Sequence, residues 1–150
     1  MEGEKRMSNY KNVLVAYDGS EMSKKAMQTA ADLLKGKEGG QLTVVNVWQM
    51  PVIGGEGIAI DLRRYQEESE KYAQKLVDEA ESLVSEANIP VKKVVLNGHP
   101  STRILEYAEE NGIDLIVMGN RGLNALKRMF LGSVSLRVVQ EAPCDVLIIK

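Results

Sequence analysis

Hydrophobic and polar positions follow two patterns in turn along this chain, and together they predict strands that alternate with helices. Continuous apolar runs, typical of strands buried on both faces, occupy 11–17, 42–48, 91–96, 113–118 and 145–149. Apolar residues spaced three and four apart predict helices over 21–35, 61–88, 101–110 and 133–141. This order predicts an α/β protein with a parallel sheet, helices on both of its faces and right-handed crossovers.

Cap residues and apolar faces refine the predicted helices. Ser20 is a good N-cap for the first helix, and Ser101 is expected to cap the third. The apolar face of the first helix is predicted to hold Met22, Ala26, Ala30, Leu33 and Leu34. The apolar face of the long second helix is predicted to hold Leu62, Tyr65, Tyr72, Leu76, Val77, Ala80, Leu83 and Val84. The charged residues of its other side are expected to form a solvated face.

A glycine-rich stretch, 118–135, follows the fourth predicted strand. Gly119, Gly122 and Gly132 are spread along it, and Ser133 directly follows the last of them at the start of a predicted helix. Glycine lets backbone N–H groups approach an anion, and a helix N-terminus adds unpaired N–H groups and the positive end of its dipole. Spacing alone leaves two interpretations open, namely a phosphate site or a connection in which the glycines only turn the chain.

The spacing resembles Gly-x2-Gly-x9-Gly-Ser/Thr, the ATP-binding motif of the universal stress protein family. It is neither a Walker A loop nor the compact dinucleotide fingerprint. The run Asp18-Gly19-Ser20-Glu21 and the closing Pro-Cys-x-Val-Leu-Ile strand are also similar to the family. The resemblance implies a three-layer α/β/α sandwich with strand order 3-2-1-4-5. Such a fold is flavodoxin- or Rossmann-like and belongs with the adenine nucleotide alpha hydrolases.

The resemblance also implies a nucleotide site. Its phosphates would be held by Ser133 and by backbone N–H groups of Gly122, Gly132 and Val134. Asp18, Gly119 and the backbone of Val47 would hold ribose and adenine. Met118, Arg121 and Ser135 complete the nucleotide-binding residues that we expect, and Lys127 and Arg128 would favour a polyanion. For an isolated acid such as Asp18, a structural role at the start of the first helix is the alternative.

Three further residues have side chains that often serve in binding or catalysis, but for most of them we expect a structural role. Trp48 could flank a base or lie at a rim or interface. His99 is the only histidine and precedes a proline in a turn, which favours an exposed loop residue over a catalytic one. Cys144 has no neighbouring base in the sequence and is expected to pack. No set of zinc-type ligands is present, so we expect a metal ion only as Mg²⁺ carried by the nucleotide phosphates.

The function that the resemblance implies is an ATP-binding switch in a stress response, with ADP or AMP as other possible ligands. A slow ATPase or phosphoryl-transfer protein is a second hypothesis, although no general base is evident. A dimeric interaction module without nucleotide is a third, and an FMN binder is a more distant fourth. The family also pairs its last strand, here 145–149, across a two-fold axis to form a homodimer, and it acts on downstream proteins that no residue here identifies.

Length, charge and cysteine content limit the number of domains, the kinds of partner and the cellular compartment that we expect. The 150 residues suit one domain, which we expect to be 11–150 after a polar leader of 1–10. A net charge of −2 argues against nucleic acid as the main partner. No apolar run is long enough to span a membrane, and the charged N-terminus is unlike a secretory signal. The single cysteine excludes an internal disulfide, so we expect a cytoplasmic protein.

Overall fold

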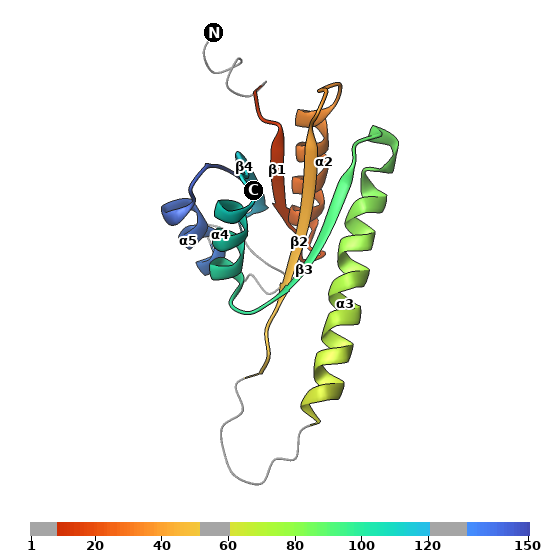
Figure 1. Ribbon diagram of the computed structural model, residues 1–150, viewed down its shortest axis with the longest axis vertical. Helices are drawn as coiled ribbons and strands as arrows, with labels where there is room; N and C mark the ends of the chain where they lie inside the picture. The colour runs from red at the N-terminus through yellow and green to blue at the C-terminus, as the bar shows by residue number, and fades with distance from the viewer. Residues whose placement is uncertain (1–8, 52–60, 121–131) are drawn as a thin grey trace.

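A computed structural model describes residues 9–51, 61–120 and 132–150 of the protein (Figure 1). Its elements are β1 (Asn12–Ala16), α2 (Glu21–Leu34), β2 (Gln41–Trp48), α3 (Leu62–Leu83), the 3-10 helix η1 (Ser85–Ala87), β3 (Val91–Asn97), α4 (Pro100–Glu110), β4 (Leu115–Gly119), α5 (Ser133–Glu141) and β5 (Asp145–Ile149). Within these residues, no helix is both long enough and apolar enough to cross a membrane.

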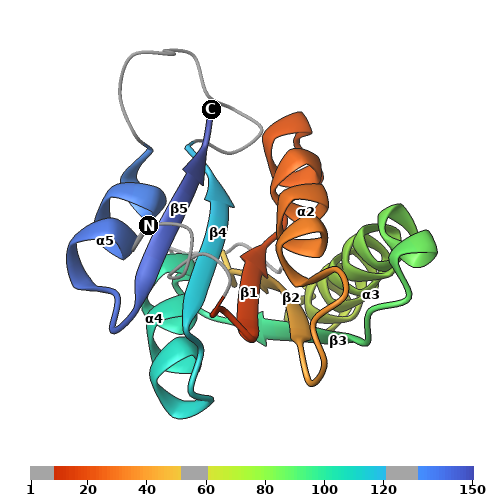
Figure 2. The ribbon, with the colours of Figure 1, turned by 90° about the horizontal axis from the view of Figure 1, so that it is seen from above.

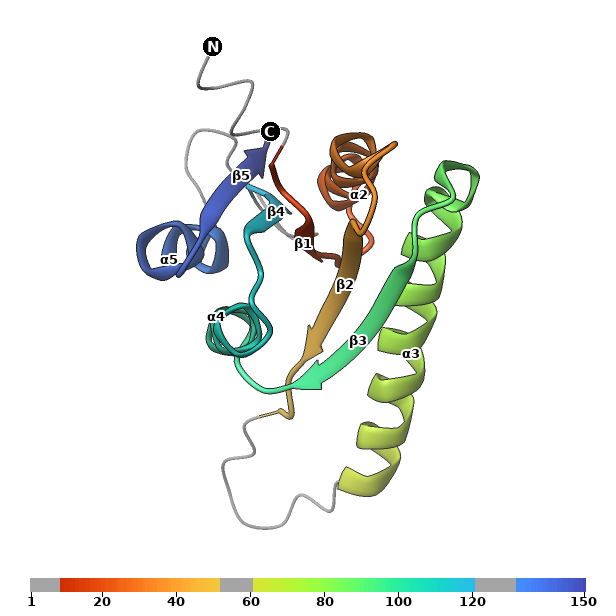
Figure 3. The ribbon, with the colours of Figure 1, turned by 45° about the horizontal axis from the view of Figure 1, so that its top comes forward.

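The five strands form one parallel sheet in the order β3-β2-β1-β4-β5, as predicted. Helices α2 and α3 cover one face, and α4 and α5 cover the other (Figures 2 and 3). The fold is therefore the expected three-layer α/β/α sandwich. Strands β3 and β5 form the two edges, so the strands buried on both faces are β2, β1 and β4.

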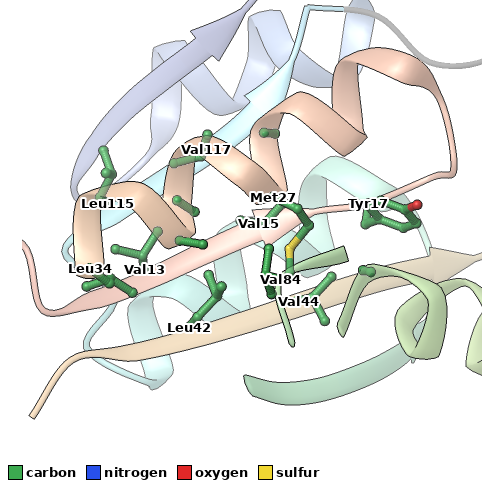
Figure 4. Packing of buried hydrophobic residues seen from close by; sticks show 14 of the residues in the cluster. Val13, Val15, Tyr17, Met27, Leu34, Leu42, Val44, Val84, Leu115 and Val117 are labelled. Atoms are coloured by element: carbon green, nitrogen blue, oxygen red, sulfur yellow. The ribbon is translucent and has the colours of Figure 1, made fainter. Parts of the chain in front are cut away.

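Side chains that alternate along the strands supply two separate cores. Val13 and Val15 of β1 point toward α2 and α3, whereas Leu14 between them joins the core under α4 and α5. Figure 4 shows the first core, in which Met27 of α2 lies near Val15 and Val44. Met27 is fully buried, although the predicted apolar face of its helix included Met22 instead.

The first half of α3 is more exposed than predicted. Leu62, Tyr65 and Tyr72 were assigned to its apolar face, yet their exposed fractions lie between 38% and 56%. Leu83, at the other end of the helix, was assigned to the same face and is 36% exposed. The 22 residues of α3 extend over about 33 Å, whereas the eight residues of β2 extend over about 26 Å. The helix therefore extends past the carboxyl end of the sheet (Figure 1), and only its later turns bury a full apolar face.

Two residues near element boundaries lie differently from the sequence prediction. Ser101 is not a cap, because α4 begins one residue earlier at Pro100 with His99 in the N-cap position. Proline at the first helical position has its φ fixed at a helical value, which explains this start. Tyr10 was placed in the polar leader, but its ring is buried in the first core and its hydroxyl donates a hydrogen bond to Asp145 Oδ2.

Cys144 packs half-buried against the second core, as expected for a structural thiol. Burial raises its pKa to about 11, and the charges of Asp145 and Asp114 add to the shift. Only the thiolate reacts with alkylating reagents. We therefore predict that iodoacetamide modifies the folded protein at pH 8 on the order of a hundredfold more slowly than the urea-unfolded chain, in which cysteine has a pKa of about 8.5.

Mass spectrometry of the single cysteine measures this rate directly. In the folded protein, the rate should rise about tenfold for each pH unit between 8 and 10, because the thiolate fraction does so below the pKa. A rate that reaches its plateau near pH 9 would show that burial does not control this thiol.

Candidate functional site

The winding of the sheet places its switch point at the carboxyl ends of β1 and β4, and we call the region beyond these ends the crevice. These strands are neighbours, with Val13 opposite Leu115 and Val15 opposite Val117. From β1 the chain continues to β2 on one side, while β4 lies on the other, so the direction of winding reverses between them. In open α/β sheets, ligands bind at this kind of switch point. The two loops selected from the sequence, at Asp18 and after Gly119, therefore leave adjacent strands.

Asp18 lies in a tight turn between β1 and α2. Its Oδ1 accepts a hydrogen bond from the backbone N–H of Ser20 at 2.9 Å, and the Ser20 side chain accepts one from Ser23 at 3.2 Å, which makes Ser20 the predicted N-cap. Gly19 between them has φ +86°, and a Cβ there would lie 3.1 Å from Leu76 of α3. The turn is thus fixed at both ends, and Oδ2 of half-buried Asp18 has no partner among the described residues.

Tyr17, directly before Asp18, holds this turn in place through hydrogen bonds to α3 and β2. The sequence pattern did not point to this residue. Its side chain is only 2% exposed, and its hydroxyl donates to Glu79 Oε1 of α3 at 2.6 Å. Burial raises the pKa of the Tyr17 phenol, and the bond to Glu79 raises it further. Its backbone carbonyl accepts from Asn46 Nδ2 of β2 at 2.8 Å. Tyr17 thereby ties the residue before Asp18 to both α3 and β2.

Val47 lies at the carboxyl end of β2, one residue before its last residue, Trp48. Its half-buried side chain packs toward α4 and α5, as predicted for a buried strand residue. Val45 accepts a hydrogen bond from Tyr17 on the β1 side, so by alternation Val47 presents its N–H and C=O to the same side. The β1–β2 ladder ends with Ala16 opposite Val45. Strand β1 therefore offers Val47 no ladder partner, which leaves these groups suited to the edge of a planar ligand.

Asn120 joins the end of β4 to the start of α5. Its N–H donates to Ile149 of β5 at 2.9 Å, and its carbonyl accepts from Gly132 N–H and from Ser135 Oγ, each at 2.7 Å. The side chain is 5% exposed, and its Oδ1 is buried without a hydrogen-bond partner among the described residues. A buried acceptor without a partner is unusual in a native protein and is consistent with a donor supplied by a ligand.

The other predicted residues at the end of β4, Met118 and Gly119, have no side chain available to a ligand. Met118 is 5% exposed and packs in the second core, so its side chain is not available to a ligand. Gly119 is the last residue of β4 and pairs with Ile149. Arg121 and Gly122, together with Lys127 and Arg128, lie outside the described residues.

The N-terminus of α5 has the properties of an anion site. Helix α5 begins at Ser133, as predicted, with Gly132 as N-cap, and no side chain of the described residues caps its first turn. The first N–H groups of a helix have no intrahelical partner. The side chain of Ser133 is exposed and Val134 is half-buried, whereas the hydroxyl of Ser135 is buried and bonded to Asn120. Phosphate contacts at Ser135 would therefore involve its N–H and not its hydroxyl.

The remaining candidates lie outside this crevice. Trp48 is 9% exposed at the end of β2. His99 is exposed, with Nδ1 3.0 Å from Ser101 Oγ, which also accepts a hydrogen bond from Arg137 of α5. Among the described residues, no three His, Cys, Asp or Glu side chains are grouped as metal ligands. Beyond β1 and β4, the described residues therefore offer one carboxylate, at Asp18, and the N-terminus of α5. The first suits a hydroxyl donor and the second suits an anion.

The fold defines an open, doubly wound α/β protein with a helix N-terminus at its switch point. The model of the Universal stress protein family matches residues 9–150, and the chain belongs to that family. The universal stress protein YxiE of Bacillus subtilis is 35% identical over 150 residues, covering 94% of this chain and 99% of YxiE.

Solved structures show the same fold. The universal stress protein UspA from Lactobacillus plantarum superposes with a TM-score of 0.82 at 26% identity, covering 94% of this chain and 98% of that one. A universal stress protein in complex with cAMP superposes with a TM-score of 0.69 at 25% identity, covering 93% and 96% of the two chains.

Proposed function

We propose that this protein binds an adenine nucleotide in the crevice between β1 and β4 and acts as a nucleotide-dependent switch in a stress response. The observation that carries the proposal is the first turn of α5, whose N–H groups lack a side-chain cap and which adjoins the end of β4. The complex of a related universal stress protein with cAMP supports an adenine ligand. ATP is the ligand that the complete glycine motif favours.

The phosphates would lie at the N-terminus of α5. The N–H groups of Ser133, Val134 and Ser135 and the hydroxyl of Ser133 would bind their oxygens, and the helix dipole would favour their charge. The contact expected from the N–H of Gly132 is not part of this set, because that group already donates to the carbonyl of Asn120 at 2.7 Å. Gly119, Arg121 and Gly122 would complete this end of the site. Any Mg²⁺ would be carried by the phosphates, because such ions keep most of their water when bound to nucleotides.

The nucleoside would extend across the ends of β1 and β2. Val47 would meet the adenine edge with its unpaired backbone groups, and Asp18 Oδ2 would accept from a ribose hydroxyl. The buried Oδ1 of Asn120 is a further acceptor at the same switch point. Since Asp18 is fixed by Ser20 and supported by Tyr17, the acceptor is already oriented before a ligand binds.

A homodimer through β5 stays a prediction. Strand β5 pairs only with β4 among the described strands, and all five of its residues are half-buried. An edge strand of this composition is usually covered in a stable protein. Its open side is therefore available for a second copy of the chain.

The test compares thermal shifts of ligand-free protein with ATP and Mg²⁺, ADP, AMP, cAMP, GTP and FMN. A ligand at a thousandfold excess over its Kd adds about 4 kcal/mol of stability, which is about 8–16 °C for a domain of this size. We expect such a shift with an adenine nucleotide. No shift with any adenine nucleotide would overturn the proposal, and rapid phosphate release from ATP would favour an enzyme instead.

Two substitutions at one position locate the phosphates. Ser133→Pro removes both the hydroxyl and the N–H at the first helical position, where proline is tolerated, and Gly132 at φ −65°, ψ 161° suits a residue before proline. Ser133→Ala removes only the hydroxyl. A lost hydrogen bond to a charged group costs about 1.5–3 kcal/mol, so Ser133→Pro should weaken ATP binding about ten- to a hundredfold, and more than Ser133→Ala. Equal affinities of the three proteins would place the phosphates elsewhere.

A further inference from the structure

A pocket of about 350 Å³ lies between the carboxyl end of β2 and the first half of α3. Asn46, Trp48 and Gln49 line it from the strand side, and Tyr65, Glu68 and Tyr72 line it from the helix. Asn46 and Trp48 alternate along β2 with Val47, whose side chain packs toward α4 and α5. The pocket is therefore on the opposite face of the sheet from α5 and its N-terminus.

Aromatic side chains are concentrated in this pocket. It contains the only tryptophan of the chain and two of its five tyrosines. Tyr72 is 56% exposed and Tyr65 is 38% exposed, although the apolar core on the same face continues under the later turns of α3. The hydroxyl of Tyr65 donates to the backbone carbonyl of Gln49 at 3.3 Å, which ties this ring to the end of β2. Ring faces held apart from the core in this way are available to a ligand.

The charge of the lining excludes an anionic ligand and favours a cation. Among the described residues, Glu68 is the only charged member of the lining, and no lysine or arginine belongs to it. Arg64 approaches Glu68 Oε1 from outside the pocket at 3.1 Å, on a surface where both side chains are mostly exposed and the pair is well screened. The faces of tryptophan and tyrosine carry negative potential and attract a cation, most strongly one that loses little hydration.

We propose that this pocket binds an organic cation of the methylated or quaternary ammonium class. The alkyl groups of such a cation pack mainly on Tyr65 and Tyr72, beside the small exposed part of Trp48, while Glu68 supplies the opposite charge. The amide side chains of Asn46 and Gln49 and the hydroxyl of Ser69 offer hydrogen bonds to a polar tail. The site uses none of the nucleotide-binding residues proposed above, so it can be tested without nucleotide.

The test titrates the full chain with choline chloride and, separately, with dimethylbutanol, the uncharged carbon isostere of choline. Sodium chloride keeps the ionic strength constant. Trp48 reports directly, because it is the only tryptophan. We expect a saturable change in its fluorescence with choline, and binding of the isostere at least about fivefold weaker, since the isostere lacks the charge. Equal binding of both probes, or no saturable change with choline, would overturn the proposal.

Substitutions in the pocket test whether the change in Trp48 fluorescence comes from choline bound there. Tyr72→Leu removes one exposed ring and should weaken choline binding about two- to fivefold, and Glu68→Gln should also weaken it. Tyr107→Leu is the matched control, because this tyrosine lies on α4 outside the pocket, where Lys92 Nζ is 6.0 Å from its ring centre. Unchanged choline affinity in Tyr72→Leu, or saturable binding of a neutral sugar such as methyl glucoside in place of choline, would contradict the assignment. Circular dichroism shows that each variant is folded.

Discussion

Replacing Tyr17 by alanine should lower the free energy of unfolding by about 3–5 kcal/mol, the range for truncating a large buried aromatic side chain. Tyr17 is 2% exposed and lies in the core under α2 and α3 (Figure 4). The substitution also removes the bond to Glu79. Urea denaturation at fixed protein concentration measures the change, provided that the slope with urea stays constant. Tyr72→Ala is the control, because an exposed ring should contribute about 0.5 kcal/mol or less.

The Tyr17 hydroxyl should make stability depend on pH in the alkaline range. Burial raises the pKa of this phenol in the folded protein above the value of about 10 that it has in the unfolded chain. The neutral phenol is thus favoured by folding, and its contribution to stability is complete below about pH 10 and is lost as the pH rises further. We expect the free energy of unfolding to fall between pH 9 and pH 11.5, and Tyr17→Phe to show a smaller fall.

Tyr17→Phe also separates the contribution of the hydroxyl to stability from the contribution of the ring. At pH 7 its cost should be about 1 kcal/mol, because Glu79 is exposed and regains hydrogen bonds to water. Tyr72→Phe serves as the matched control at an exposed position. Identical alkaline profiles for wild type and Tyr17→Phe would show that this hydroxyl ionises without loss of packing.

Met27→Ala should lower the free energy of unfolding by about 2–5 kcal/mol, while Met22→Ala on the same helix should cost less than about 1 kcal/mol. Met27 is fully buried against β1 and β2, whereas Met22 is only half-buried. Both substitutions change helix propensity equally, so the difference between them measures packing alone. Thermal or urea unfolding of the two variants gives that difference, and similar losses would mean that the helix rotates to bury either side chain.

Met22 and Met27 also show that hydrophobic periodicity predicts a helix better than it predicts which side chains the helix buries. The spacing of Ala26, Ala30 and Leu34 predicted α2 and the centre of its buried face correctly. Met22 and Met27 lie nearer the margins of that face, and only the angle at which α2 meets β1 and β2 decides which of them is buried. The long helix α3 shows the same limit, because its overhang depends on the length of β2 as well as on its own length.

The residues of the candidate site likewise fall into two groups, those that the sequence identified and those that only the tertiary structure revealed. Asp18, Gly119, Gly132 and Ser133 were selected from the glycine spacing and the family resemblance. Their places in a turn, at a strand end and at a helix start are as predicted, because neighbouring residues determine such features. Tyr17 and Glu79, 62 residues apart, and the links that Asn46 and Asn120 form to other strands were not found. No periodic pattern relates such distant partners.

The sequence by itself determined the alternation of strands and helices, the glycine spacing and the N-cap at Ser20, since all of these depend on contacts within a few residues. Tertiary structure decided which strands are neighbours, and thereby that the turn at Asp18 and the end of β4 border one crevice. It also decided that Trp48, Tyr65 and Tyr72 line one pocket. The physical reason is that parallel strands bring their carboxyl ends to the same edge of the sheet, whatever their separation along the chain.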